Sequence, residues 1–156
     1  MEHQSPITNH QSQIIIMRTI SLIIVHCSAV RPYQESGVSE IDRWHKARGW
    51  KNGCGYHYVI RRDGTIEIGR PLSMVGAHCQ NHNRHSIGVC YEGGLNIDGI
   101  PRDTRTRAQT QALRQLLEQL HSQFPKALIM GHNVFTPTKA CPCFNAAEEY
   151  RDLQPD

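Results

Sequence analysis

The sequence lacks the features that mark two specialised classes of protein. Its 17 basic and 14 acidic residues leave a net charge of +3, and no run of Lys or Arg would track a nucleic-acid backbone. The most apolar stretch, residues 14–25, is interrupted by Arg18 and is too short to span a bilayer. We therefore expect neither a nucleic-acid partner nor a membrane partner.

Cysteine is too sparse for a disulfide scaffold. The six cysteines in 156 residues fall below the density of small disulfide-rich domains, and Cys141 and Cys143 are too close in sequence for an ordinary bridge. No basic segment precedes the apolar stretch, so no signal peptide is expected. These observations predict synthesis in the cytoplasm with reduced thiols.

The length predicts one domain. A chain of 156 residues can bury a core without disulfides, and we expect it to act as a monomer. Residues 1–16 are rich in Gln, Ser, His and Asn and show almost no hydrophobic period, so they are predicted to form a disordered tail ahead of a domain at 17–156. Met17 directly precedes the first strand-like run, which suggests that translation naturally starts there.

Five short apolar runs predict the strands of a central sheet. The first is β-branched and continuous, which is typical of a strand buried on both faces. The second and third are separated by Asp63-Gly64, a dipeptide that favours tight hairpin turns. The predicted strands span residues 19–26, 56–61, 65–68, 86–91 and 127–130.

Capping patterns predict about three helices. Ser39 with Asp42 resembles a capping box, and Gly49 would end that helix. Thr106 with Gln109 begins a stripe of Ala and Leu that ends before Pro125, and Asn145 can cap a final helix. Together with the strands, these helices predict an α/β (or α+β) domain with a mixed central sheet of about five strands.

The chemistry concentrates near the C-terminus, where His132 lies a few residues from Lys139 and Cys141. His and Cys are good Zn²⁺ ligands, and catalytic zinc takes three protein ligands plus a water. His26, at the end of the first predicted strand, is a candidate for the third ligand. A single histidine is more often a surface or hydrogen-bonded core residue, and spacing leaves open whether these three side chains converge.

Five short motifs follow one another along the chain in an order that resembles one known family. They resemble the type 2 N-acetylmuramoyl-L-alanine amidases, the bacteriophage-lysozyme-type zinc amidases, which are related to the peptidoglycan-recognition proteins. Members cut the amide between the muramic acid lactyl group and L-alanine of peptidoglycan. The resemblance covers about residues 19–144. The motifs are Ile24-Val25-His26-Cys27-Ser28, Gly55-Tyr56-His57-Tyr58, Arg62-Asp63-Gly64, Ser86-Ile87-Gly88-Val89-Cys90 and Lys139-Ala140-Cys141-Pro142.

The resemblance implies a site, residue by residue. It implies Zn²⁺ on His26, His132 and Cys141, with Tyr56 and Lys139 as the catalytic pair. It also implies that the loop around His78 lines the groove for a peptidoglycan or muropeptide substrate, with His78 as a substrate-binding residue. In such a site zinc activates water, Lys139 stabilises the developing oxyanion, and the Tyr56 hydroxyl positions the water.

Three nearby residues need a separate interpretation. Cys143 is interpreted as a small structural residue, because a second thiolate on the metal would close its open position. Glu92 is a rival base at a strand end, but lies two residues from the expected position and is left out of the catalytic set. Asn133-Val134 follows His132 where the family more commonly has His-Arg-Asp or His-x-Asp, so the resemblance supplies no acidic partner for the metal site here.

Two other functions remain open from the sequence. A non-catalytic peptidoglycan-binding domain would keep the groove without the chemistry, although the complete ligand set favours the enzyme. A structural zinc or thiol redox site is disfavoured because the chain lacks Cys-x-x-Cys pairs. An amidase without an export signal suits an endolysin that acts on the cell wall once released, a prophage remnant or a recycling enzyme.

Overall fold

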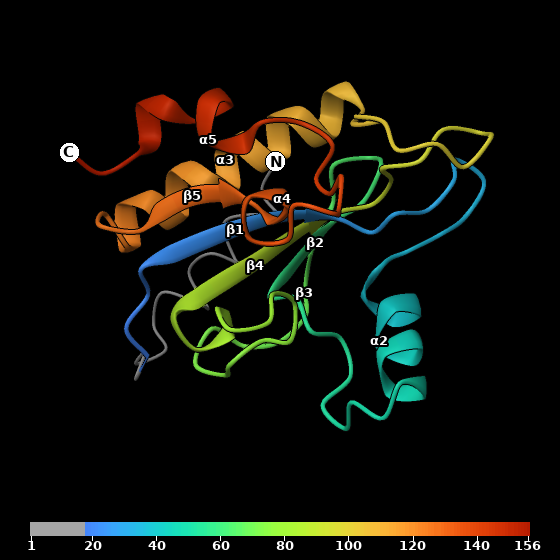
Figure 1. The fold of residues 1–156 in the computed structure, drawn as a ribbon, viewed down its shortest axis with the longest axis horizontal. Helices are drawn as coiled ribbons and strands as arrows, with labels where there is room; N and C mark the ends of the chain where they lie inside the picture. The colour runs from blue at the N-terminus through green and yellow to red at the C-terminus, as the bar shows by residue number, and fades with distance from the viewer. Residues whose placement is uncertain (1–17) are drawn as a thin grey trace.

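A mixed five-stranded sheet organises residues 18–156, the part of the chain that the computed structural model describes (Figure 1). The order across the sheet is β3-β2-β4-β1-β5. The tail predicted for residues 1–16 and the start predicted at Met17 lie outside the described residues. The strands are β1 (Leu22–Cys27), β2 (Tyr58–Ile60), β3 (Ile66–Ile68), β4 (Ser86–Tyr91) and β5 (Leu128–Gly131).

The pairing of the strands confirms the predicted fold class. β1 lies between β4 and β5 and runs parallel to both, and β2 runs parallel to β4. β3 pairs antiparallel with β2 through the predicted hairpin, where Gly64 has a φ of +91°. Because the carboxyl ends of parallel strands meet at one edge, loops that follow β1 and β5 lie close together.

The two helices predicted after residue 105 begin at the predicted caps. α3 (Arg107–Gln123) starts after Thr106, whose Oγ1 accepts from the Gln109 backbone N–H at 3.0 Å. α5 (Ala146–Glu149) starts after Asn145, and a short 3₁₀ turn, Arg151–Leu153, completes the predicted final helix. Figure 1 shows α3 and α5 on one side of the sheet and α2 (Val38–Ala47) apart from them.

The start of α2 differs from the prediction. The cap is Gly37, whose N–H donates to Glu40 Oε1 at 2.8 Å, so the predicted Ser39–Asp42 box is wrong. Asp42 instead accepts from the Cys54 backbone N–H at 3.0 Å, a tertiary contact that local sequence does not encode. Gly49, with a φ of +92°, follows the helix as predicted. A further short helix, α4 (His132–Phe135), was not predicted.

The side chains of β1 alternate between the two faces of the sheet, and this decides which face carries His26. Ile23 and Val25 belong to the main core, which includes the Leu residues of α3. Leu22 and Ile24 belong to a smaller cluster with Cys79 and Met130 on the other face. Because side chains alternate along a strand, His26 shares the face of Leu22 and Ile24, opposite to α3.

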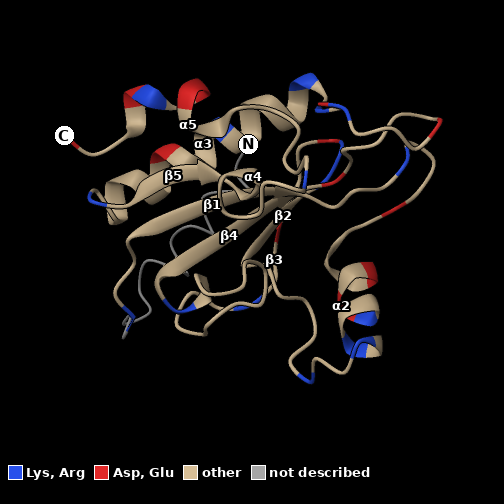
Figure 2. Cartoon of the chain, in the orientation of Figure 1, with Lys and Arg blue, Asp and Glu red and all other residues tan. Residues whose placement is uncertain are grey.

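Charges of both signs are distributed over the helices and loops, as Figure 2 shows. Among residues 18–156, no helix combines the length and the apolarity that crossing a bilayer requires. The six cysteines all lie in the described part of the chain and none is paired in a disulfide.

Candidate metal centre

Three side chains predicted as ligands converge at one end of the sheet. One ligand atom from each of His26, His132 and Cys141 lies within 4.8 Å of the other two. His26 is the penultimate residue of β1, His132 directly follows the neighbouring strand β5, and Cys141 lies in the loop after α4. Tetrahedral zinc places nitrogen and sulfur ligands about 3.5 Å apart, so small side-chain movements would complete the geometry.

The hydrogen bonds of the two histidines leave one nitrogen of each for a metal. His26 Nε2 lies 2.8 Å from His78 Nδ1, and His132 Nε2 lies 3.3 Å from Thr136 Oγ1. The Nδ1 atoms of His26 and His132 are therefore the candidate ligands. Asn133 does not bond to His132; its side-chain amide donates to the Ala140 carbonyl at 3.4 Å and ties α4 to the Cys141 loop.

The surroundings of the two nearby cysteines differ. The Cys27 backbone N–H donates to Cys141 Sγ at 3.0 Å, and Cys141 Sγ lies 3.7 Å from the Cys27 carbonyl oxygen, so the thiol is held against the end of β1. Cys143 Sγ lies 4.0 Å from Cys27 Sγ and donates to the Gly94 carbonyl at 3.5 Å. The hydrogen bond with Cys27 and burial raise the pKa of the Cys143 thiol, and it is absent from the converging group.

Burial keeps the histidines of the site neutral. Desolvation, followed by the charges of His78 and His132, lowers the pKa of His26 well below its ordinary value. Desolvation and then the Lys139 charge lower the pKa of His132. Neutral imidazoles carry the lone pair that a metal needs, so both side chains are ready as ligands at neutral pH.

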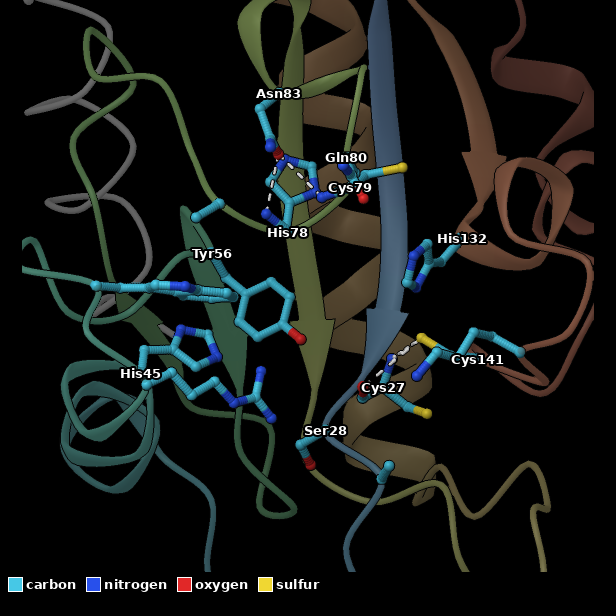
Figure 3. A pocket seen from close by; sticks show the side chains of 15 residues that line it. Cys27, Ser28, His45, Tyr56, His78, Cys79, Gln80, Asn83, His132 and Cys141 are labelled. Carbon is cyan, nitrogen blue, oxygen red and sulfur yellow. Dashed lines mark hydrogen bonds between the residues drawn. The ribbon is translucent and has the colours of Figure 1, made fainter.

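Two members of the converging group, His132 and Cys141, line a cleft of about 550 Å³, and the third, His26, is buried. Figure 3 shows Tyr56 on one wall, opposite His132 and Cys141. The Tyr56 ring centroid lies 5.0 Å from that of His26, and burial raises the pKa of the Tyr56 phenol well above its ordinary value. Other lining residues come from β1, from α2 and from the segments that follow β1, α2, β3 and α4: Cys27, Ser28, Ala29, His45, Arg48, Trp50, Ala77, His78, Cys79, Gln80, Asn83 and Lys139.

The structure therefore brings every predicted site residue to one place, and adds others that the sequence did not single out. His45 contacts both Trp50 and Tyr56, with ring centroids 4.6 and 5.8 Å apart, and accepts from the Gly55 N–H at 2.9 Å. Its helical spacing alone resembles that of a core residue. Thr136 and Ser86 also lacked a signal, because their partners His132 and His78 become apparent only in the fold.

Glu92 belongs to a different cluster. Only 2% of its side chain is exposed, and it accepts from the Ser36 N–H at 2.6 Å and from Arg61 at 3.1 Å. Burial alone would raise the pKa of the Glu92 carboxyl, but these hydrogen bonds outweigh it and the pKa is lowered. An ionised, fully bonded carboxylate outside the cleft is not suited to serve as the base.

Comparisons with known proteins find one matching family and several similar phage proteins. A family model described as N-acetylmuramoyl-L-alanine amidase matches residues 17–144. The endolysin of Klebsiella phage KP32 is 48% identical over 125 residues, which cover 80% of this chain and 82% of that protein. The endolysin of Escherichia phage T7 is 46% identical over 123 residues, which cover 79% of this chain and 80% of that protein.

A solved structure shares the fold. The N-acetylmuramoyl-L-alanine amidase LysC from Clostridium intestinale URNW superimposes with a TM-score of 0.72 at 28% identity, covering 89% of this chain and 88% of that one.

Proposed function

Because the chain belongs to the N-acetylmuramoyl-L-alanine amidase family and is an amidase of peptidoglycan, we propose that Zn²⁺ held by His26, His132 and Cys141 is its cofactor. The observation that carries the proposal is the convergence of two neutral imidazoles and one thiol beside an open cleft. Two nitrogens and one sulfur suit zinc, and three protein ligands leave a position for substrate or water. Bound there, zinc supplies Lewis-acid activation of water and polarisation of the scissile carbonyl.

The protein contributes the orientation of the reactants. The cleft admits the lactyl-L-alanine amide between the Tyr56 wall and the wall of His132 and Cys141. The Tyr56 hydroxyl, kept protonated by burial, donates a hydrogen bond that orients the attacking water or the substrate. The ring of His45 contacts Tyr56 and packs in turn against Trp50, which limits the rotation of Tyr56.

Lys139 supplies positive charge. It is an exposed residue on the rim of the cleft, close enough to His132 to lower the pKa of that imidazole. An ammonium group at this position stabilises the negative charge that develops on the carbonyl oxygen during attack by water. That charge barely exists in the ground state, so the interaction acts mainly on the transition state.

The similarity to phage endolysins supports a role in breaking the bacterial cell wall when the protein is released. We propose this role over turnover inside the cell. The amidase chemistry itself is the same in either setting, because it depends on the cleft and not on the route to the substrate.

The test of the cofactor is a metal titration. Chelated protein should be inactive on purified peptidoglycan and should recover activity with one equivalent of zinc. The variant His26→Ala should neither retain zinc nor recover activity. Full activity of the chelated protein, or zinc binding by His26→Ala equal to that of the wild type, would contradict the assignment.

A further inference from the structure

We propose that His78 is a positioning residue that fixes the ring orientation and the tautomer of the metal ligand His26, through a hydrogen-bond chain that ends at Ser86. This inference rests on the proposed zinc site. It gives His78 a different task from the substrate contact that the sequence predicts.

Two consecutive contacts connect His26 to Ser86 through the His78 ring. His26 Nε2 lies 2.8 Å from His78 Nδ1, and His78 Nε2 lies 3.1 Å from Ser86 Oγ. The His26 and His78 rings meet edge to face with centroids 4.9 Å apart. Both ring nitrogens of His78 therefore have protein partners, although the residue borders the cleft.

The direction of the hydrogen bonds follows from the metal. If His26 Nδ1 gives its lone pair to zinc, His26 Nε2 carries the hydrogen and donates it to His78 Nδ1. His78 must then carry its own hydrogen on Nε2, which donates to Ser86 Oγ. Ser86 Oγ can accept the hydrogen that this arrangement leaves on His78 Nε2, and His78 Nδ1, left as an acceptor, favours the tautomer of His26 that presents Nδ1 to the metal.

The fold makes room for the His78 ring and holds its backbone. A Cβ atom on Gly88 would lie 2.6 Å from His78 Cγ, and one on Gly76 would lie 2.7 Å from His78 Cδ2. The Asn83 side chain accepts the backbone N–H groups of His78 and Cys79, each at 2.9 Å. The His78 ring packs on Gly88 of β4 and its backbone is anchored, so the ring is held in one orientation. Such a ring is suited to orient His26 and poorly suited to adjust its position to a bound substrate.

His78 differs chemically from the carboxylate that often accepts a hydrogen bond from a metal-binding histidine. Metal-binding histidines often donate to a carboxylate, which adds negative charge beside the metal. His26 donates to a neutral imidazole, because His78 Nδ1 can accept this hydrogen bond only while it carries no hydrogen itself. His78 therefore orients His26 without adding charge, which leaves the metal a stronger Lewis acid than a carboxylate partner would.

The test measures zinc affinity by competition with a chromogenic chelator. His78→Ala should weaken zinc binding by about 10- to 100-fold, the usual cost of losing an outer-shell partner. His78→Asn should restore most of the affinity, because its side-chain oxygen can replace Nδ1 as acceptor. The matched control is His82→Ala, in the same loop, whose ring contacts His85 and Phe135; its affinity should equal that of the wild type.

Catalysis at saturating zinc separates positioning from substrate contact. For His78→Ala the KM for a soluble muropeptide should stay at the wild-type value. Unchanged zinc affinity with a raised KM would overturn the proposal in favour of substrate contact. Wild-type protein that binds no zinc would instead contradict the proposed function itself, so the two failures are distinguishable.

A measurement on the unmodified protein covers the case in which His78→Ala does not fold. Nitrogen-15 chemical shifts of the zinc-loaded wild type should show His26 metal-bound at Nδ1 and protonated at Nε2, and His78 protonated at Nε2. The reverse tautomer of either ring would overturn the proposal.

Discussion

The backbone N–H of Cys27 donates to Cys141 Sγ at 3.0 Å, which joins two residues 114 positions apart in the chain. Cys27 ends β1 directly after His26, so this bond brings the loop thiol to the strand that carries the first candidate ligand. The contact also selects between two cysteines of the same loop, because Cys143 Sγ faces the Cys27 side chain and the Gly94 carbonyl.

Cys141→Ser should therefore abolish peptidoglycan hydrolysis and weaken zinc binding by at least ~100-fold, because a serine hydroxyl is a poor zinc ligand and even an outer-shell loss costs about 10- to 100-fold. Cys143→Ser is the matched control and should keep most of the activity and the zinc. Metal analysis after gel filtration and a turbidity assay on purified cell walls measure both. Equal loss in the two variants would contradict the ligand assignment.

Lys139→Ala should lower kcat by about 100-fold, since removing one oxyanion-stabilising donor typically costs ~3 kcal/mol. Zinc content should not change, because Lys139 is outside the converging group. Lys126→Ala, an exposed lysine ahead of β5, should behave as the wild type. Steady-state kinetics on a muropeptide measure the effect, and a loss confined to KM would mean that Lys139 only binds substrate.

Tyr56→Phe should lower kcat by roughly 100-fold while the protein keeps its zinc and its melting temperature. The substitution removes the hydroxyl and keeps the ring, so the contacts with His26 and His45 persist. The comparison that isolates the hydroxyl is activity per mole of bound zinc. Wild-type turnover in Tyr56→Phe would exclude a catalytic hydroxyl and leave Tyr56 a packing residue.

Glu92→Gln should lower stability and spare the chemistry. Its buried carboxylate bonds to Arg61 and to the Ser36 N–H, so removing the charge should cost about 1 to 3 kcal/mol near neutral pH. Activity per folded molecule and zinc content should match the wild type. A catalytic defect at full zinc occupancy would restore Glu92 as a candidate base.

The pH dependence of that stability has a defined sign. The folded state lowers the pKa of Glu92 below the ordinary 4.5, so its contribution is present above 4.5 and is lost as the pH falls through the folded-state pKa. The difference in unfolding free energy between the wild type and Glu92→Gln should therefore shrink in acid. Urea unfolding at pH 7 and at pH 3 measures it, and a difference that grows in acid would contradict the account.

The sequence predicts the elements whose signals are local. The strand at 86–91 has the predicted bounds, and the Thr106–Gln109 capping box marks the start of α3. The cap of α2 was misplaced because Asp42 satisfies a distant backbone N–H of Cys54. α4 was missed because its four residues are too few to show a helical period.

The residues of the candidate site could be predicted from local motifs, but their contacts could not. The ligand types and Tyr56 follow from motifs, but their convergence depends on β1 and β5 being neighbours, which pairing across about 100 residues decides. The contact between His78 and His26 has no sequence signal at all. It depends on the register that places Gly88 beside Ile24 and leaves space for the ring.

A zinc site of His26, His132 and Cys141 that cuts the lactyl-L-alanine amide would separate the stem peptides from the glycan. The most direct measurement digests purified peptidoglycan with zinc-loaded and with chelated protein and reads the fragments by mass spectrometry. The proposed site predicts free stem peptides that begin with L-alanine, released only by the zinc-loaded protein. Stems that remain joined to the glycan, or the same peptides released by the chelated protein, would contradict it.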